Sequence, residues 1–474
     1  MIGSALLVIP EVSLKDKVAS IQYDDALFIA TSAFTDTGLT PLNISQTYSV
    51  FGQILIMLFI QLGGIGIVAF KYLVWTLILG RPTSLSDDNI LHLEKGGTKR
   101  GHSTSIIRRA LIMFFAVELI GFLFFTAYFI STNSISLGSE VGDNTSPVNN
   151  AGQAVFYGLF HSISAINNAG FDIFGGRSLA MFDHDQFIQV VTMILFIIGG
   201  MGFPIIYDLI YFLKARMFDN KRAKLMLLTK ITIIGYFSVM IIGVLFAVIS
   251  EGIVASNTDY IDETKKIEPL FNNGNYTAYE KWMILFFHTS SARSAGFSYY
   301  PMEALSPSTQ TLIGILMFIG AGPSSTGGGV RVTSFFVVIA ALFSFSRNQG
   351  EINIFKRTLS KSNRKSANRT ILASALIVIG IALLVILTMG ASKNAGKSSM
   401  QNTLFFETVS AFGTTGLSYK NLTSSLLTIP KLLIALIMII GQLGMNNVLT
   451  IFQPGKKTSR KYAKHFPIEH VIGV

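Results

Sequence analysis

Four short stretches of the sequence share one pattern, and this pattern decides the fold. They read SAFTDTGL at 32–39, SAINNAGF at 164–171, SSARSAGF at 290–297 and SAFGTTGL at 410–417. Each contains Thr or Ala, then Gly, then Leu or Phe, and subtraction of their numbers puts the glycines 132, 126 and 120 positions apart. A glycine that merely ends a helix in a left-handed cap would explain one copy. The even recurrence of the whole motif indicates an internal repeat instead.

We call these stretches glycine loops 1 to 4, and their surroundings are strongly apolar. The chain has 474 residues, of which 50% are hydrophobic and 13% charged, with no cysteine, and its mean hydropathy is +0.53. A soluble domain carries about 25% charged residues. The composition therefore excludes a conventional soluble enzyme, a disordered chain and a disulfide-stapled secreted module. It predicts an all-α polytopic membrane protein that contacts the lipid bilayer.

Apolar runs of two lengths surround the loops. About 20 apolar residues cross a bilayer, whereas 10–14 more often do not. Seven long runs are predicted to be full spans, near Tyr48–Leu79, Ile106–Ile130, Phe187–Leu213, Leu225–Ile249, Thr309–Phe345, Arg369–Met389 and Ser425–Phe452. Four shorter segments directly precede or include the glycine loops, near Asp25–Phe34, Ala154–Ile166, Tyr279–Ala292 and Asn402–Phe412. These are too short to cross, so each is expected to enter the membrane and return.

The distribution of basic residues predicts the orientation. The net charge is +11, and Lys and Arg cluster between the apolar runs, around 81–109, 214–230, 347–369 and 456–464. The loop Ser131–Gly152 has neither Lys nor Arg. The positive-inside rule puts the basic clusters and the C-terminus in the cytoplasm, which makes the chain a multi-pass cell-membrane protein with its glycine loops on the outer side. A nucleic-acid partner is not expected, because no basic stripe with interleaved aromatic residues lies on a soluble face.

The repeating unit is a span, a short helix with its glycine loop, and a second span. It divides the chain into residues 1–80, 106–215, 225–346 and 369–453, followed by a cytoplasmic tail at 454–474. The first span is truncated, because Met1–Ile9 reaches only about 14 Å as a helix against about 30 Å of hydrocarbon. We therefore expect the natural chain to extend upstream of Met1.

Glycine-rich loops at membrane depth favour a cation path. Backbone there must be hydrogen-bonded, buried in protein or facing water. Carbonyl oxygens of such a loop can replace the hydration shell of an ion, and glycine permits the positive φ that turns them toward one axis. A short helix that ends at the loop also directs its negative dipole end toward the cation. Four loops then form one ring around a pseudo-fourfold pore.

At this point the sequence resembles the Trk/Ktr/HKT superfamily of potassium transporters, most closely the Ktr-type membrane subunit. The resemblance covers nearly the whole chain, and it rests on the glycine loops, Gly63-Gly64-Ile65-Gly66, Arg293-Ser294-Ala295-Gly296-Phe297, the segment 321–329 and the ending 466–473. It implies K⁺ uptake, four membrane–pore–membrane repeats, a homodimer and a cytosolic nucleotide-binding regulatory ring. Any ATP, ADP or NAD would be bound by that partner subunit, and no cofactor is expected in this chain.

The predicted K⁺ site is a selectivity filter whose backbone carbonyls bind the ion. Its residues are Thr37, Gly38, Ala169, Gly170, Ala295, Gly296, Thr415 and Gly416. The family resemblance implies an intramembrane gating loop within Gly320–Gly329, made of Gly322, Ser324, Ser325, Thr326, Gly327, Gly328 and Gly329. These glycines and Pro323 cannot hold a regular helix at low cost. A phosphate-binding loop is excluded, because Gly-Lys-Ser/Thr does not follow.

Gln442 departs from the family, which usually has a basic residue after the glycine that is Gly441 here. In the family this residue lies in the pore beneath the filter, so its loss is expected to lower the barrier to cations or to alter gating.

Asp36 either attracts cations at the outer mouth or only solvates a loop. Arg293 is expected to brace glycine loop 3 through carbonyls or a carboxylate such as Glu407.

Enzymatic activity is not expected, because no catalytic arrangement of residues is present, and His161 and His288 are expected to be structural rather than metal ligands. The alternative function is a cation-coupled secondary transporter with broken helices. It predicts inverted halves and paired charges at mid-membrane, whereas this chain has four units of one topology.

Overall fold

A computed structural model describes most of the chain. It covers residues 2–9, 12–13, 21–66, 103–132, 150–175, 178–217, 224–256, 270–347, 352–355, 357–359, 361–390, 398–419 and 425–451. The predictions about the basic residues near 81–100, the tail 454–474 and the far end of the run Tyr48–Leu79 fall outside these residues.

Three long apolar helices are uninterrupted. They are α7 (Ser103–Ser131), α11 (Leu227–Ser256) and α15 (Lys361–Gly390). Each contains an apolar window long enough to cross a membrane, with at most two charged residues. These helices are the first spans of the second, third and fourth predicted units.

The helices that follow glycine loops 2, 3 and 4 are each broken into two, whereas α4, which follows glycine loop 1, is described up to its end at Gly66. They are α4 (Val50–Ile65), α9 and α10 (Gln186–Met201 and Phe203–Met217), α13 and α14 (Pro307–Ile319 and Val332–Ser346), and α17 and α18 (Thr428–Leu443 and Met445–Ile451). The helices α4, α9, α13 and α17 each end at a glycine with positive φ, namely Gly66, Gly202, Gly320 and Gly444. The predicted span over Phe187–Leu213 is not one straight helix, because α9 and α10 meet at 101°. The run Ser425–Phe452 is likewise interrupted at Gly444. The break in Thr309–Phe345 occurs at the predicted segment.

Four short helices precede the glycine loops. They are α2 (Tyr23–Phe34), α8 (Ala151–Ile166), α12 (Ala278–Ser291) and α16 (Ser398–Gly413). Local sequence sets their starts: Asn150 accepts a hydrogen bond from the amide of Gln153, and Thr277 and Glu280 form a reciprocal capping box. Smaller elements are α1 (Ile2–Leu7), α3 (Ile44–Thr47), η3 (Ala180–Phe182) and η5 (Met302–Ala304).

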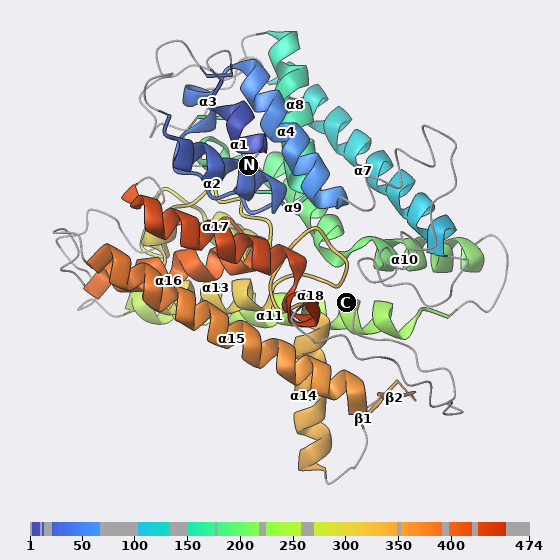
Figure 1. Cartoon of the computed structure of the whole chain (residues 1–474). Coiled ribbons are helices and arrows are strands. Elements are labelled where there is room, and N and C mark those ends of the chain that lie inside the picture. Colours follow the sequence, from blue (N-terminus) through green and yellow to red (C-terminus); the bar gives the residue numbers. More distant parts are fainter. Residues whose placement is uncertain are drawn as a thin grey trace.

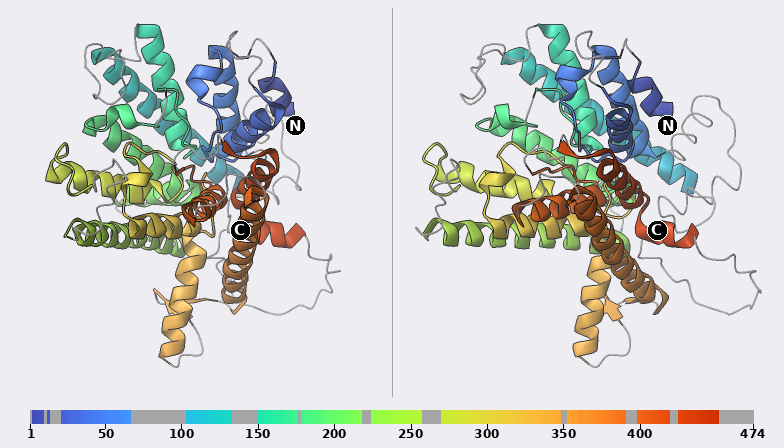
Figure 2. Two further views of the ribbon diagram at one scale, coloured as in Figure 1. Left: turned by 90° about the vertical axis from the view of Figure 1, so that its left-hand side faces the viewer. Right: turned by 60° about the vertical axis from the view of Figure 1, so that its left-hand side comes forward.

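A two-stranded antiparallel hairpin departs from the all-α prediction. Strand β1 (Ile352–Ile354) pairs with β2 (Arg357–Leu359), with Asn353 opposite Thr358. Both views of Figure 2 show α14 projecting from the body of the protein. The hairpin packs beside that helix, so it lies away from the glycine loops.

The first and last parts of the chain lie side by side. In Figure 1, α17 runs next to α2, and the two helices are in direct contact. Helix α4 contacts α8, α9 contacts α12, and α13 contacts α16. Helices α4, α9 and α13 therefore each pack against the short helix of the following unit, and α17 packs against the short helix of the first. These four contacts close a circle.

Candidate functional site

The four glycine loops share positive φ angles at two matching positions. The glycine of each loop has positive φ, at 88° for Gly38, 66° for Gly170, 76° for Gly296 and 85° for Gly416. The residue two positions before it also has positive φ: Asp36, Asn168, Ser294 and Thr414. A side chain is rarely tolerated in this region outside glycine, asparagine and aspartate. Loops 1, 2 and 4 turn back from the ends of their short helices in the same way, whereas in loop 3 the φ of Ser294 is 148° and the Ala295 amide bonds to Ser291.

The structure brings the eight predicted filter residues into one ring. A Cβ on Gly38 would lie 2.5 Å from the carbonyl oxygen of Ala169, and one on Gly170 would lie 2.9 Å from that of Ala295. A Cβ on Gly296 would lie 2.1 Å from the Thr415 oxygen, and one on Gly416 would lie 2.0 Å from the Thr37 oxygen. The fourth contact returns to the first loop. Only glycine fits at these positions, so the ring is built from backbone groups.

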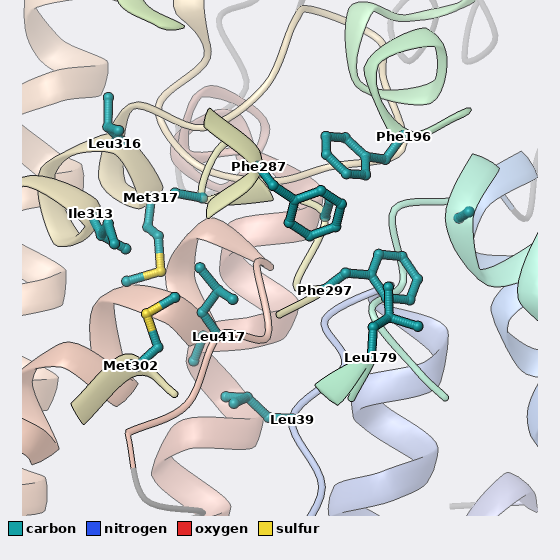
Figure 3. Packing of buried hydrophobic residues seen from close by; sticks show 14 of the residues in the cluster. Leu39, Leu179, Phe196, Phe287, Phe297, Met302, Ile313, Leu316, Met317 and Leu417 are labelled. Carbon is teal, nitrogen blue, oxygen red and sulfur yellow. The ribbon is translucent and has the colours of Figure 1, made fainter. Parts of the chain in front are cut away.

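Apolar side chains anchor the ring in the protein core. The residue after each glycine is almost fully buried: Leu39, Phe171, Phe297 and Leu417. Figure 3 shows Leu39, Phe297 and Leu417 among the buried apolar side chains of the core, with Leu417 near Met317 and Phe297 near Leu179. Their burial fixes where each loop leaves the ring, because interiors are close-packed.

The segment after α13 packs directly against the ring. The amide of Gly328 donates to Thr414 Oγ1 at 2.6 Å, and a Cβ on Gly327 would lie 2.4 Å from the side chain of Ser294. The amide of Gly322 donates to the carbonyl of Gly200 at 2.8 Å. The segment therefore touches glycine loops 3 and 4 and the break between α9 and α10.

The other predicted gating residues lie within the same packed segment. Ser325 Oγ donates to the carbonyl of Gly322 at 2.8 Å, and Thr326 is buried. Ser324 has a positive φ of 56° and Gly329 one of 84°. Arg331 also belongs to this arrangement, although the sequence reasoning missed it. Its Nη1 donates to Ser325 Oγ at 2.9 Å and to the carbonyls of Gly322 and Gly327.

Gln442 lies beside glycine loop 1. Its Nε2 donates to Asp36 Oδ2 at 3.4 Å. Asp36 has an exposed fraction of 0%, which rules out the interpretation that this side chain only solvates a loop. The neutral amide of Gln442 thus lies next to a buried carboxylate of glycine loop 1.

The side chain of Arg293 binds backbone carbonyls of the third unit. This is one of the two kinds of partner expected from the sequence, the other being a carboxylate. Arg293 donates from Nε and Nη2 to the carbonyl of Gly320, at 3.0 and 2.6 Å, and from Nη1 to that of Tyr236 at 3.2 Å. The suggested partner Glu407 is wrong. Glu407 instead accepts from Ser418 Oγ at 2.6 Å and from the Tyr419 amide at 2.9 Å.

The two buried histidines have ordinary structural contacts. His161 Nε2 is 2.8 Å from Thr192 Oγ1, and His288 Nδ1 is 2.7 Å from the carbonyl of Ile284. Within the described part of the chain, no group of three His, Asp or Glu side chains could hold a metal ion.

A second glycine pattern could have revealed the helix breaks. Gly63-Gly64-Ile65-Gly66, Gly199-Gly200-Met201-Gly202 and Gly441-Gln442-Leu443-Gly444 share a glycine at the first and last positions. A Cβ on Gly63, Gly199 or Gly441 would lie 2.0–2.4 Å from the backbone oxygen of Phe34, Ile166 or Phe412, respectively. The first glycine thus lets each helix approach its own short helix, and the last one ends it.

The chain is similar to known cation transport proteins by family model, by sequence and by fold. Residues 5–461 match the family model described as TrkH, a cation transport protein. The chain is 32% identical to an uncharacterized cation transporter of Mycoplasma genitalium, over 98% of this chain and 94% of that protein. It is 31% identical to Ktr system potassium uptake protein D of Bacillus subtilis, with 94% and 89% covered. The fold is similar to the crystal structure of the potassium transporter TrkH from Vibrio parahaemolyticus, with a TM-score of 0.62, 16% identity, and 92% and 79% covered.

Proposed function

Because the chain belongs to the TrkH family of cation transport proteins, we propose that it takes up K⁺ through the ring of its four glycine loops. The family is one of membrane transporters, so the chain is not an enzyme. The observation that carries the proposal is the closed ring, in which each loop glycine faces the backbone oxygen of the next loop. A ring of backbone carbonyls can replace the hydration shell of K⁺.

Four units around this ring would form the pore. We assign them to residues 1–80, 106–215, 225–346 and 369–453, with the filter at Thr37-Gly38, Ala169-Gly170, Ala295-Gly296 and Thr415-Gly416. The short helices end at the ring, so their C-terminal dipole ends favour a cation there. Uptake would follow the electrochemical gradient, to which the membrane potential contributes about 2.3 kcal/mol per charge per 100 mV.

The segment Gly322–Gly329 would be the gate. Its support is the direct contact of Gly328 with Thr414 at the base of glycine loop 4. A loop that is hydrogen-bonded to the filter can obstruct the path below it and open when those bonds break. Gln442 would line the same path, next to Asp36.

The assembly and orientation are also proposals. The relatives from B. subtilis and V. alginolyticus are named as proteins of Ktr potassium uptake systems. We propose a homodimer in the cell membrane with its C-terminus in the cytoplasm, regulated by a separate nucleotide-binding ring. Nucleotide would act through that ring and not through a site in this chain.

Complementation tests the function. The chain is expressed in a strain that lacks K⁺ uptake, with and without a cytosolic regulatory subunit, and growth is measured at low external K⁺. We expect rescue that Gly296→Ala abolishes, because a Cβ there would lie 2.1 Å from the Thr415 oxygen. Absence of rescue despite expression in the membrane would contradict K⁺ uptake. K⁺ uptake that requires a Na⁺ or H⁺ gradient would favour a coupled secondary transporter instead.

A further inference from the structure

The ring is closed by a contact between its first and fourth units, which are not consecutive in the sequence. Glycine loops 1, 2, 3 and 4 follow one another along the sequence, so each of the first three contacts joins consecutive units. The contact of Gly416 with Thr37 joins the fourth unit to the first. We call this contact and the packing of α2 against α17 the seam. No segment that directly links consecutive units spans the seam, so it depends on contacts between α2, α17 and the two glycine loops.

A buried ion pair crosses the seam. Lys431 Nζ lies 2.5 Å from Asp25 Oδ1 and 3.4 Å from Asp24 Oδ2. Lys431 and Asp25 have exposed fractions of 7% and 6%. Thr428 Oγ1 also donates to Asp24 Oδ2, at 3.0 Å. Both carboxylates lie in the first turn of α2, where the helix dipole already favours negative charge.

The other junctions use neutral or partly exposed groups. Asn167 Nδ2 donates to Gln61 Oε1, Asn168 Nδ2 to Ser294 Oγ, and the Gly328 amide to Thr414 Oγ1. His184 and Glu280 also meet between the second and third units, but the histidine side chain is 50% exposed. Among the described residues, the ion pair of Lys431 with Asp25 is therefore the one that joins two units and has both of its side chains buried.

The spacing of the seam contacts ties the ion pair to the glycine loop. Lys431 and Gln442 are eleven residues apart by subtraction, and so are Asp25 and Asp36. Eleven helical residues extend about 16 Å. Lys431 holds the start of α2, while Gln442 contacts Asp36 just beyond its end. Helix α17 thus fixes α2 at both ends and determines where glycine loop 1 meets glycine loop 4.

We propose that Lys431 and Asp25 are positioning residues that clasp the seam and thereby set the discrimination of K⁺ from Na⁺ by the ring. The proposal rests on the proposed function. A filter selects among cations through the number and arrangement of its carbonyls. If the clasp opens, glycine loop 1 shifts relative to its neighbours and the ring loses its fixed geometry.

Four variants test the clasp in proteoliposomes, with K⁺ and Na⁺ uptake measured in parallel. Lys431→Met and Asp25→Asn are each expected to lower the K⁺/Na⁺ uptake ratio about tenfold, which corresponds to about 1.4 kcal/mol. The double variant Lys431→Met with Asp25→Asn leaves only Asp24 without its ion-pair partner, and Asp24 keeps its hydrogen bond from Thr428. It is therefore expected to fold better than Lys431→Met alone, which leaves both carboxylates unpaired. It should nevertheless keep the low ratio. Lys431→Arg retains the charge and should stay within about twofold of the wild type.

Lys281→Met is the matched control. Lys281 also lies near the start of a short helix, but its Nζ donates to the carbonyl of Phe271 within the same unit, at 2.9 Å. The control should keep the wild-type ratio. A wild-type ratio in the double variant would overturn the clasp, because ring geometry would then not depend on it. Absence of K⁺ uptake by the wild type would overturn the proposed function instead.

A cross-link tests the seam without transport. The sequence contains no cysteine, so Asp24→Cys with Thr428→Cys introduces the two thiols alone. With a protease site inserted between residues 81 and 100, oxidation is expected to keep the two fragments together until a reductant is added. Fragments that separate under oxidising conditions would overturn the seam contact.

Discussion

The hydroxyl of Thr414 accepts a hydrogen bond from the amide of Gly328 at 2.6 Å, and this bond joins the proposed gate to the base of glycine loop 4. Both residues are buried. Thr414 is also one of the four residues with positive φ two positions before a loop glycine. The geometry of the ring and the position of the gating segment are thus coupled through one side chain.

Replacing Thr414 by Val should loosen the gate. Valine keeps the shape of the side chain but leaves the Gly328 amide without its acceptor, at a cost of about 1–3 kcal/mol. We expect higher K⁺ flux in proteoliposomes that contain no regulatory subunit. Thr408→Val is the control, because Thr408 Oγ1 bonds to the Leu404 carbonyl of its own helix, at 2.8 Å. Equal flux in both variants and the wild type would contradict the coupling.

Adding a methyl group to the ring should abolish selective uptake. In Gly416→Ala the new Cβ would lie 2.0 Å from the Thr37 oxygen, and the φ of 85° is unfavourable for alanine. Gly380→Ala is the matched change in α15, where nothing lies within 4 Å of the added atom. The latter should transport normally and gain up to about 1 kcal/mol of stability from helix propensity. Complementation growth and thermal unfolding measure the two effects; normal uptake by Gly416→Ala would contradict the filter assignment.

Arg293 should stabilise the break after α13 through its forked geometry. It contacts the Gly320 carbonyl with two nitrogens, and its guanidinium lies 4.5 Å from the ring centre of Tyr236. Lysine cannot reproduce this arrangement. We expect Arg293→Lys to lower the free energy of unfolding by about 1.5–3 kcal/mol, seen as a lower Tm in detergent. Arg369→Lys, at an exposed position of α15, should leave Tm unchanged, and an equal Tm for both would refute this role.

Stability should depend on pH through His184, which lies in the turn before α9. Its hydrogen bond to Glu280 and the charge of Asp183 raise the pKa of His184 above its usual 6.5. The folded state therefore binds the proton more tightly, and this contribution is complete below about pH 6.5. It disappears as pH rises through the folded-state pKa.

His184→Gln removes this contribution. The Tm difference between wild type and His184→Gln should be largest near pH 5.5 and should shrink toward pH 8.5. The difference should be small at every pH, because the side chain of His184 is half exposed and solvent screens its pairing with Glu280. Glu280→Gln keeps a side chain that can cap α12 but removes the charge, so it should flatten the profile similarly. A Tm difference that is constant with pH would contradict the assignment.

A positive charge at position 442 should hinder cations. Gln442 lies beside buried Asp36, and an arginine there would pair with the carboxylate or repel cations in the proposed path. We expect Gln442→Arg to lower K⁺ flux in proteoliposomes, with Gln442→Asn near the wild type. Unchanged flux and gating in Gln442→Arg would refute the effect of this substitution.

Much of the architecture could be predicted from local sequence. The glycine loops were found by their recurrence, and the short helices α2, α8, α12 and α16 overlap the predicted short segments. The break at Gly320–Gly329 also follows from glycine and proline content, because these residues weaken a helix wherever they occur. Such features depend on the chemistry of neighbouring residues, so sequence alone can reveal them.

The breaks at Gly202 and Gly444 are marked in the sequence only by the recurring pattern of two glycines three positions apart. One such pair in an apolar run is compatible with a continuous helix, so packing decides the conformation. A Cβ on Gly202 would lie 2.4 Å from the Pro323 oxygen, which belongs to another unit. Neighbouring segments therefore impose a positive φ that local propensity does not require.

The sequence by itself determined that this chain is a membrane protein with four equivalent glycine loops, because hydropathy and motif recurrence are local properties. The tertiary structure alone decided which groups meet: Lys431 with Asp25 and Thr414 with Gly328. Lys431 and Asp25 are separated by more than 400 residues. Their partners depend on how all units pack around one ring, and no local pattern of residues encodes that packing.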